Sequence, residues 1–366
     1  MTLAEQIRQP TLLLDSNKAQ HHIARLVHKA QTSGVRFRPH FKTHQSAVIG
    51  DWFRQRGVQA ITVSSVDMAR YFADNGWTDI TIAFPVNVRQ LPEIDALAQR
   101  VRLGLLVESI ETAVTLHQHL THDVHIWLKI DAGYQRTGIH WQDVELATAV
   151  AQAVTAAPQL HLTGLLAHSG HTYGVTGETA VQAIYHETVA RLQTMQAALR
   201  QHGWQVALSI GDTPGASLVD NFRDVDEIRP GNFVFYDVMQ AQIGACALED
   251  IAVALACPVV TKHPARQQIV LYGGAVHLSK EMLRGDDGVN YGRIARLTHS
   301  DWEILPYKVV SLSQEHGIVQ GDEALLRETA VGDLLLVLPI HSCLTANLMK
   351  RYLTLNGEWI EMCSAC

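Results

Sequence analysis

Residues 101–133 read VRLGLLVESIETAVTLHQHLTHDVHIWLKIDAG, and this stretch indicates the fold. Its two apolar runs, Arg102–Val107 and His125–Ile130, are typical of strands that are buried on both faces. The stretch Ile110–His119 between them is helix-like. A helix between two buried strands predicts parallel pairing through a right-handed crossover.

The same alternation recurs through the first two thirds of the chain. Six further runs predict strands, namely Val35–Arg38, Ala60–Val63, Asp79–Ala83, Leu160–Ala167, Gln205–Ile210 and Glu227–Arg229. Helix-like stretches lie between them, such as Ser65–Asn75, Gln142–Ala156 and Thr179–His202. Eight such units close a barrel, so we expect a (β/α)₈ TIM-like barrel over residues 16–240. A doubly wound open sheet is the alternative, but no G-x-G-x-x-G follows an early strand.

After about residue 240 the pattern changes to short strands separated by turns. The expected strands are Ile251–Val260, Gln267–Leu271, Lys308–Leu312, Leu334–Leu338 and Tyr352–Leu355. Helical periodicity is weak there, which predicts an antiparallel β domain. We expect this C-terminal domain to comprise residues 1–15 plus 241–366, with Thr11–Asp15 as a further strand.

The composition of the 366-residue chain is that of a folded globular protein, with 47% apolar and 18% charged residues. A formal charge of −7 and the lack of a Lys/Arg run do not favour nucleic acid as a partner. The start of the chain does not resemble a signal peptide, and no apolar run approaches a membrane span.

The five cysteines are odd in number and all lie in the last third of the chain. This usage does not suit a disulfide framework and favours a reducing compartment, so we expect a cytoplasmic protein. Cys363 and Cys366 form a lone C-x-x-C pair at the end of the sequence, where a frayed tail is favoured over a metal site.

The first predicted strand runs into Arg38-Pro39-His40-Phe41-Lys42-Thr43-His44. In a barrel the C-terminal ends of the strands carry the chemistry, so Lys42 can project into the barrel mouth. Desolvation and neighbouring cations would lower the pKa of its amine and free it to form a Schiff base. A solvated surface lysine is the other interpretation.

Two glycine-rich turns follow the last two predicted strands of the barrel. One contains Gly211 and Thr213, and the other contains Gly231 and Asn232. Barrel phosphate sites are often built from these two loops, where glycines let backbone N–H groups approach an anion. A lysine across the mouth from such a cradle suits pyridoxal phosphate. Ordinary Gly/Pro turns remain the alternative.

Polar loops also follow the fifth and sixth predicted strands. In the first, Arg136 can pair with an anionic ring oxygen or a carboxylate. In the second, Tyr173 can pack against a flat ring. Each residue, taken alone, is equally compatible with ordinary loop structure.

In the second domain, His341 and Cys343 follow a predicted strand and are two positions apart. In an extended conformation they would face the same side. Imidazole plus thiolate suits Zn²⁺, and two protein ligands would leave positions open for a substrate, as a Lewis acid requires. A free cysteine beside a satisfied histidine is the alternative.

Together these segments resemble the fold-type III pyridoxal-phosphate enzymes, and more narrowly the D-serine dehydratase / D-threonine aldolase family. The resemblance covers nearly the whole chain. Residues 39–44 match the P-H-x-K-T-H signature, whose lysine carries the cofactor in that family. The resemblance therefore implies pyridoxal 5′-phosphate on Lys42. It also implies a set of cofactor-binding residues: Gln135, Arg136, His168, Tyr173, Gly211, Thr213, Gly231 and Asn232.

His341-Ser342-Cys343 matches the dehydratase branch, which holds zinc with His-x-Cys, whereas the aldolases typically use His-x-Asp. The K-T-H sequence that begins at the cofactor lysine, Lys42-Thr43-His44, also matches that branch. The implied metal is Zn²⁺, or Mn²⁺ or another divalent cation. One departure is Leu166, where the family often has a tyrosine. The resemblance further implies a homodimer with its active site near the subunit interface.

The resulting functional prediction is a lyase that converts a D-β-hydroxy amino acid to a 2-oxo acid and ammonia. The substrates considered are D-serine, D-threonine and D-threo-3-hydroxyaspartate, and the sequence does not distinguish among them. The alternatives are a D-threonine aldolase, an amino-acid racemase and a cofactor carrier without turnover. A racemase needs a second base that we do not identify, and a carrier would not need the His-x-Cys domain.

Overall fold

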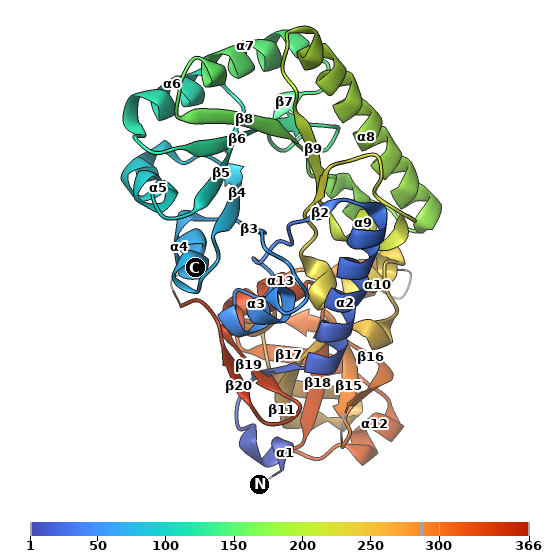
Figure 1. The fold of residues 1–366 in the computed structure, drawn as a ribbon. Coiled ribbons are helices and arrows are strands. Elements are labelled where there is room, and N and C mark those ends of the chain that lie inside the picture. Colours follow the sequence, from blue (N-terminus) through green and yellow to red (C-terminus); the bar gives the residue numbers. More distant parts are fainter. Residues whose placement is uncertain (1, 286–287, 300, 365–366) are drawn as a thin grey trace. The chain divides into compact units, whose positions relative to one another are not determined.

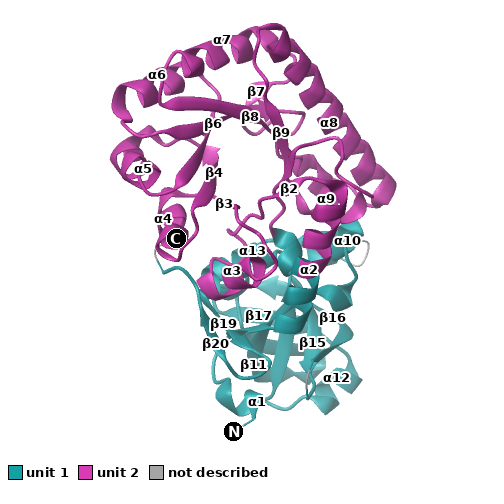
Figure 2. Cartoon of the chain, viewed as in Figure 1, with its two compact units in different colours: residues 1–23, 232–364 teal, residues 24–231, 365–366 magenta. Residues whose placement is uncertain are grey.

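The computed structural model describes residues 2–285, 288–299 and 301–364. The chain forms two compact units, which Figure 2 shows in different colours. The barrel unit comprises residues 24–231, and the β unit comprises residues 232–364 with the first 23 residues. The domain boundaries predicted above, residues 16–240 and residues 1–15 plus 241–366, stay a prediction.

The barrel unit is built on eight parallel strands, in the order β2-β10-β9-β8-β6-β5-β4-β3. Their bounds are β2 (Arg36–Phe37), β3 (Ile61–Val63), β4 (Asp79–Pro85), β5 (Arg102–Val107), β6 (Val124–Asp131), β8 (Leu160–Leu166), β9 (Ala207–Ile210) and β10 (Glu227–Ile228). A short strand, β7 (Ile139–His140), pairs with β6. Each of the eight predicted strands has a counterpart, which confirms the barrel and rejects the open-sheet alternative.

The residues just after β2 close the ring of strands. His40 forms an isolated parallel bridge with Thr62 of β3. The Phe41 N–H donates to the Thr62 carbonyl at 2.8 Å, and the Thr62 N–H donates to the Pro39 carbonyl at 2.9 Å. On its other side, β2 pairs with β10. The segment that precedes Lys42 is therefore fixed from both sides.

Helices form the outer layer of the barrel unit, around the strands (Figure 1). The chain enters the unit along α2 (Ser16–Ser33), and the other helices are α3 (Ala47–Arg54), α4 (Val66–Asp74), α5 (Leu91–Ala98), α6 (Ile110–His119), α7 (Val144–Thr155), α8 (Glu178–Gln201) and α9 (Thr213–Leu218). Several begin at a residue whose side chain accepts from a backbone N–H of the first turn: Ser65 for α4, Ser109 for α6 and Asp143 for α7. These caps fix where each strand-to-helix loop ends.

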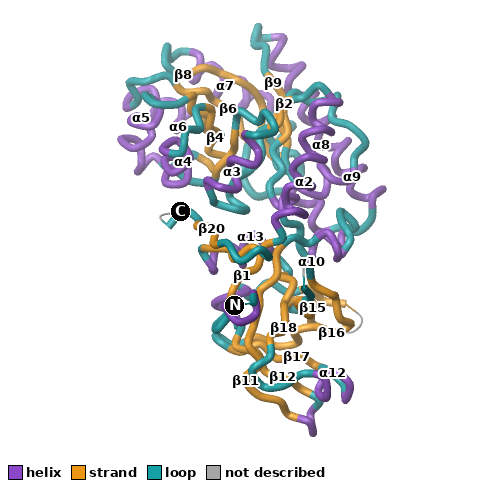
Figure 3. The backbone as a smooth tube through the Cα atoms, turned by 60° about the horizontal axis from the view of Figure 1, so that its bottom comes forward, coloured by secondary structure: helices purple, strands orange, loops and turns teal. Residues whose placement is uncertain are grey.

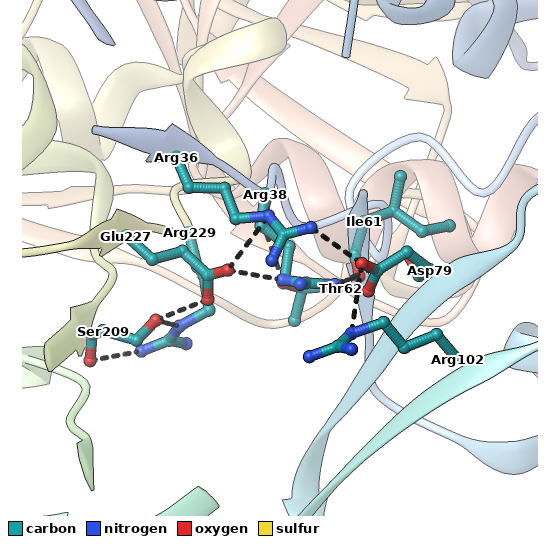
Figure 4. A network of polar contacts seen from close by, with 9 residues as sticks. All are labelled: Arg36, Arg38, Ile61, Thr62, Asp79, Arg102, Ser209, Glu227 and Arg229. Carbon is teal, nitrogen blue, oxygen red and sulfur yellow. Dashed lines mark hydrogen bonds and ion pairs between the residues drawn. The ribbon is translucent and has the colours of Figure 1, made fainter. Parts of the chain in front are cut away.

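Buried ion pairs link the strands across the seam of the barrel (Figure 4). The Arg38 guanidinium contacts Glu227 Oε2 at 2.7 Å and Asp79 Oδ1 at 2.6 Å. Glu227 also accepts from the Ser209 hydroxyl at 2.7 Å. Arg38 and Glu227 are each 2% exposed. Burial alone would lower the pKa of Arg38, but Glu227 and Asp79 outweigh it and raise that pKa.

The β unit is predominantly strand, whereas the barrel unit alternates strand and helix (Figure 3). Six strands form a ring, in the order β11-β12-β17-β16-β15-β18 and back to β11, with antiparallel pairing. Their bounds are β11 (Val253–His263), β12 (Gln268–Tyr272), β15 (Gly292–Leu297), β16 (Trp302–Leu312), β17 (His316–Gln320) and β18 (Leu334–Pro339). The expected antiparallel C-terminal domain is therefore confirmed.

Three strands extend this sheet: β1 (Thr11–Leu14), β19 (Arg351–Thr354) and β20 (Trp359–Glu361). Strand β1 pairs with β11 and β19, so the first strand of the chain joins the β unit, as expected. The remaining elements are α1 (Leu3–Gln6), α10 (Val238–Ile243), α11 (Ala275–Leu278), α12 (Glu323–Glu328), α13 (Ser342–Met349) and the β13 (Leu283–Gly285)–β14 (Gly288–Asn290) hairpin.

Among the described residues, no helix has the length and apolar character that crossing a membrane requires. The expectation of a frayed tail at Cys363 is wrong. Cys363 is only 1% exposed and takes part in a disulfide. Its C-x-x-C neighbour Cys366 lies outside the described residues.

The buried Arg38–Glu227 pair predicts a large effect on stability. We expect Glu227→Gln to lower the free energy of unfolding of the barrel unit by about 3–5 kcal/mol, because it leaves the buried Arg38 charge without its main partner. Thermal unfolding of the variant measures this. The control is Asp74→Asn, which breaks the exposed Arg100–Asp74 pair and should cost ~1 kcal/mol or less. Equal shifts for the two variants would contradict the prediction.

Candidate active site

The predicted site residues of the barrel unit follow neighbouring strands of the ring. Lys42 follows β2, Gly231 follows β10, Gly211 and Thr213 follow β9, His168 and Tyr173 follow β8, and Gln135 and Arg136 follow β6. Because the strands are parallel, all these residues lie at the C-terminal edge, where barrel enzymes place their chemistry.

Lys42 lies in a turn whose other members are buried. Phe41 and Thr43 are 0% exposed, whereas the Lys42 side chain is exposed. The Lys42 N–H donates to His40 Nδ1 at 3.4 Å, and the Lys42 carbonyl accepts from Gln45 Nε2 at 3.1 Å. The backbone of Lys42 is therefore fixed while its amine remains accessible.

The lysine turn lies beside the second glycine turn rather than across the mouth from it, because β2 pairs with β10. A Cβ atom on Gly231 would lie 2.8 Å from the His40 carbonyl oxygen and 3.1 Å from Thr43 Oγ1. A Cβ atom on Gly211 would lie 2.8 Å from the Arg229 carbonyl oxygen. Both positions therefore require glycine for close backbone packing.

Thr213 is the first residue of α9 and is 1% exposed. Its N–H donates to the Tyr173 hydroxyl at 3.4 Å, which joins the loops after β9 and β8. The preceding residue, Asp212, caps α9 and accepts from the Gly215 N–H at 2.6 Å and from the Thr172 hydroxyl at 3.0 Å. Burial raises the pKa of Asp212 to about 6.

His168 and His40 lie close to Lys42. Burial, followed by the charge of Lys42, lowers the pKa of each imidazole well below its usual value. His168 Nδ1 donates to the Gly211 carbonyl, which leaves Nε2 unprotonated in the neutral ring. The edge therefore combines one lysine amine with two imidazoles that stay neutral at pH 7.

Gln135 and Arg136 lie in the exposed loop after β6. Gln135 has a φ of 58°, a conformation that few non-glycine residues adopt. The Arg136 guanidinium lies 5.0 Å from the centre of the Tyr134 ring. Its charge contributes to the lowered pKa of His168, so Arg136 belongs to the same edge.

Sequence reasoning missed two buried cations at this edge. Arg229, 5% exposed, donates to Ser209 Oγ at 2.7 Å and to the Ala167 carbonyl at 2.6 Å. Burial lowers the pKa of Arg229 to about 10. Burial, with Arg229 and Arg136 nearby, lowers the pKa of Lys129 to about 8. The position of Arg229 directly before Pro230-Gly231 was the available signal.

Leu166, where the resembled family often has a tyrosine, is 1% exposed and packs in a cluster with Leu106 and Trp127. These neighbours offer an apolar environment, so leucine suits the position in this chain.

The β unit carries the predicted metal ligands, but not in an extended conformation. Strand β18 ends at Pro339 and α13 begins at Ser342, so His341 is the N-cap of a helix and Cys343 lies in its first turn. That local prediction was wrong, because a buried carboxylate, Asp237, accepts from the Ser342 N–H at 3.0 Å and fixes the helix start.

The side chains of His341 and Cys343 nevertheless meet. Burial would lower the pKa of His341, but a hydrogen bond to Cys343 and the charges of Cys343 and Asp237 raise it to about 9. Cys343 is 9% exposed. Among the described residues, no group of three or more His, Cys, Asp or Glu is arranged to hold a metal ion. The two side chains can therefore supply only two ligands.

Asn232, predicted as a cofactor ligand, belongs to the β unit. Its Nδ2 donates to Asp237 Oδ2 at 2.6 Å and to Ser342 Oγ at 3.0 Å, and lies 3.6 Å from Cys343 Sγ. The side chain of Asn232 is therefore engaged beside the candidate metal ligands.

Comparison with known proteins agrees with this two-unit organisation. Residues 14–238 match the family model "Alanine racemase, N-terminal domain", and residues 252–355 match "Putative serine dehydratase domain". The first match covers more than half of the chain.

Several characterised proteins are similar over nearly the full length. D-threo-3-hydroxyaspartate dehydratase of Delftia sp. (strain HT23) is 29% identical, over 95% of this chain and 94% of its own. D-serine dehydratase of Dictyostelium discoideum is 25% identical, with coverage of 96% and 94%. 3-Hydroxy-D-aspartate aldolase of Paracoccus denitrificans (strain Pd 1222) is 23% identical, with coverage of 97% and 90%.

The solved structure of the Delftia enzyme superposes with a TM-score of 0.91 at 28% identity, and covers 99% of this chain and 98% of that one. Structures of two single-residue variants of that enzyme are also similar, one with a histidine and one with a cysteine replaced by alanine. The cysteine variant is described as metal-free. From the matched models and this shared fold, the chain belongs to the fold-type III pyridoxal-phosphate family of D-serine dehydratases and D-threonine aldolases.

Proposed function

We propose that this protein is a pyridoxal-phosphate- and metal-dependent dehydratase that converts a D-β-hydroxy amino acid to a 2-oxo acid and ammonia. D-Serine, D-threonine and D-threo-3-hydroxyaspartate are the candidate substrates. The observation that carries the proposal is the hydrogen-bonded pair His341–Cys343, a donor set that suits zinc and not the harder cations. The homodimer and the cytoplasmic location stay predictions.

The C-terminal edge of the barrel fits the cofactor. Gly211 and Gly231 allow the turns after β9 and β10 to pack closely against Arg229 and His40. Backbone N–H groups of such glycine turns can bind a phosphate. Thr213 adds a hydroxyl group beside them, and the turn that carries Lys42 packs against Gly231 through His40 and Thr43. We propose that these residues hold pyridoxal phosphate, with Arg136 and Tyr173 contacting its ring.

When bound, pyridoxal phosphate supplies a sink for negative charge at the Cα atom of the substrate. Lys42 would hold the cofactor and, once displaced by the substrate amine, accept the Cα proton. The Nδ1–H of His168 donates to the Gly211 carbonyl, which fixes the orientation of the imidazole. The neutral imidazole could then help to orient the cofactor ring without adding charge.

Loss of the β-hydroxyl also requires that it become a better leaving group, and the β unit would supply this. A divalent cation held by His341 and Cys343 supplies Lewis-acid assistance to the β-hydroxyl. Two protein ligands leave positions open for the substrate. One structure of the similar Delftia enzyme is described as metal-free, which points to metal binding by that relative and supports a metal role here.

The aldolase is the second candidate, because an aldolase of Paracoccus denitrificans also aligns over 97% of this chain. It would remove the proton of the β-hydroxyl and break the Cα–Cβ bond, which yields glycine and an aldehyde. The two reactions share the cofactor and differ in their products.

The products of the reaction provide the first test. We expect purified protein to release ammonia and a 2-oxo acid from at least one D-β-hydroxy amino acid, without forming glycine. Lys42→Ala should abolish both this turnover and the visible absorbance of the lysine-bound cofactor. Formation of glycine and an aldehyde would establish the aldolase instead, and appearance of the L-enantiomer would indicate a racemase.

Removal of the metal provides the second test. Treatment with a chelator should stop turnover and leave the absorbance of the lysine-bound cofactor unchanged, because the metal and the cofactor use different residues. Added Zn²⁺ should restore the rate in the wild type but not in Cys343→Ala. Turnover that continues after full removal of metal would exclude the Lewis-acid role.

The turn that contains Gly231 provides the third test. Gly231→Ala should reduce the content of bound pyridoxal phosphate, because its Cβ atom forces the turn away from His40 and Thr43. The control is Gly174→Ala, since no atom lies within 4 Å of a Cβ atom there. Cofactor content is measured by absorbance after release with alkali. Full cofactor content in Gly231→Ala would contradict the proposed role of this turn.

A further inference from the structure

The amide of Asn232 has one orientation that its neighbours allow. Asn232 is 6% exposed, and its Nδ2 faces Asp237 Oδ2, Ser342 Oγ and Cys343 Sγ. Its Oδ1 has no hydrogen-bond partner among the described residues. Exchanging the two atoms would place a carbonyl oxygen 2.6 Å from a carboxylate, so the donor must point toward Asp237 and the cysteine.

Asp237 uses its two carboxylate oxygens for different tasks. Oδ1 accepts from the Gln240 N–H at 3.0 Å and so caps α10. Oδ2 accepts from the Ser342 N–H at 3.0 Å, from the Ser342 hydroxyl at 3.3 Å and from Asn232. Asp237 is 1% exposed. One buried carboxylate thus fastens the beginnings of α10 and α13.

The contact between Asp237 and Ser342 determines where the candidate metal ligands lie, because the two ligands are the neighbours of Ser342 in the chain. His341 precedes Ser342 and Cys343 follows it, so fixing the Ser342 N–H fixes the backbone of both. In addition, the Met239 N–H of α10 donates to the Ile340 carbonyl, just after the end of β18, at 3.2 Å. Asn232 then limits the position of the sulfur itself.

We infer that Asp237 and Asn232 are positioning residues that hold His341 and Cys343 in the geometry needed to bind a divalent cation. The inference rests on the metal role proposed above and reassigns Asn232 from cofactor binding to the support of the candidate metal ligands. Partners of this kind orient metal ligands, and their loss typically weakens metal binding about 10–100-fold.

The test measures metal binding without turnover. Full-length protein carrying pyridoxal phosphate is stripped of metal and titrated with Cd²⁺, and the cadmium–thiolate absorbance band reports both affinity and coordination by sulfur. Asp237→Ser keeps a side-chain oxygen to cap α10 and removes the oxygen that holds Ser342. Asn232→Ala removes the donor facing Cys343. Cys343→Ala identifies the band.

The matched control is Asp322→Ala. Asp322 caps α12 in the same unit and accepts from the Leu325 N–H at 2.8 Å and from the Tyr307 hydroxyl at 2.9 Å. Within the part of the chain that the structure describes, no hydrogen bond or ion pair links Asp322 to His341 or Cys343. Thermal unfolding of all variants reports the structural cost of losing a cap or a buried hydrogen bond. A purely structural role would lower the unfolding midpoint without changing the Cd²⁺ affinity of the folded protein.

We expect Asp237→Ser and Asn232→Ala to weaken Cd²⁺ binding about 10–100-fold, while Asp322→Ala binds as the wild type does. Wild-type affinity in both folded variants would overturn the inference and leave the proposed function intact. Lack of a cadmium–thiolate band in the wild type would overturn both, because Cys343 would then not be a ligand. A variant that does not fold at room temperature is replaced by Asp237→Asn, which keeps the size of the side chain.

Discussion

The backbone hydrogen bonds between Pro39, Phe41 and Thr62 close the ring of parallel strands directly before the candidate catalytic lysine. Strand β2 is only two residues long, so its own pairing with β10 provides little support. The Arg38 guanidinium, buried against Glu227 and Asp79, holds the strand ends on either side of the seam. The position of Lys42 depends on this closure, because the lysine turn begins where the bridge to β3 ends.

Closure in this order also determines which loops become neighbours. Because β2 joins β10 and β10 joins β9, the lysine turn and both glycine turns occupy consecutive positions at the same edge. An amine and two stretches of bare backbone are therefore adjacent without any long side chain having to reach across the barrel. The imidazoles of His40 and His168 add hydrogen-bonding groups at the same edge.

In the β unit, the position of the candidate metal ligands depends on the start of a helix. A short helix, α13, begins at Ser342, soon after β18 ends at Pro339, and the start of that helix carries both candidate metal ligands. A buried carboxylate far away in the sequence fixes this start, since Asp237 and Ser342 are separated by 105 positions. The chain passes from the barrel unit to the β unit between Gly231 and Asn232, so two adjacent residues serve different halves of the proposed chemistry.

The sequence by itself determined the barrel, the β domain and the family, and it singled out the candidate lysine, because these depend on local signals. Apolar runs spaced by helices imply parallel strands, and residues 39–44 carry a motif that is contiguous in the chain. Tertiary structure alone decided the neighbours of Lys42, the burial of Arg229 and Lys129, and the helical rather than extended conformation at Ser342. Those features depend on contacts between residues far apart in sequence, such as Asp237 with Ser342. The residues after β18 do not by themselves indicate that the distant Asp237 carboxylate accepts from the Ser342 N–H at the start of the helix.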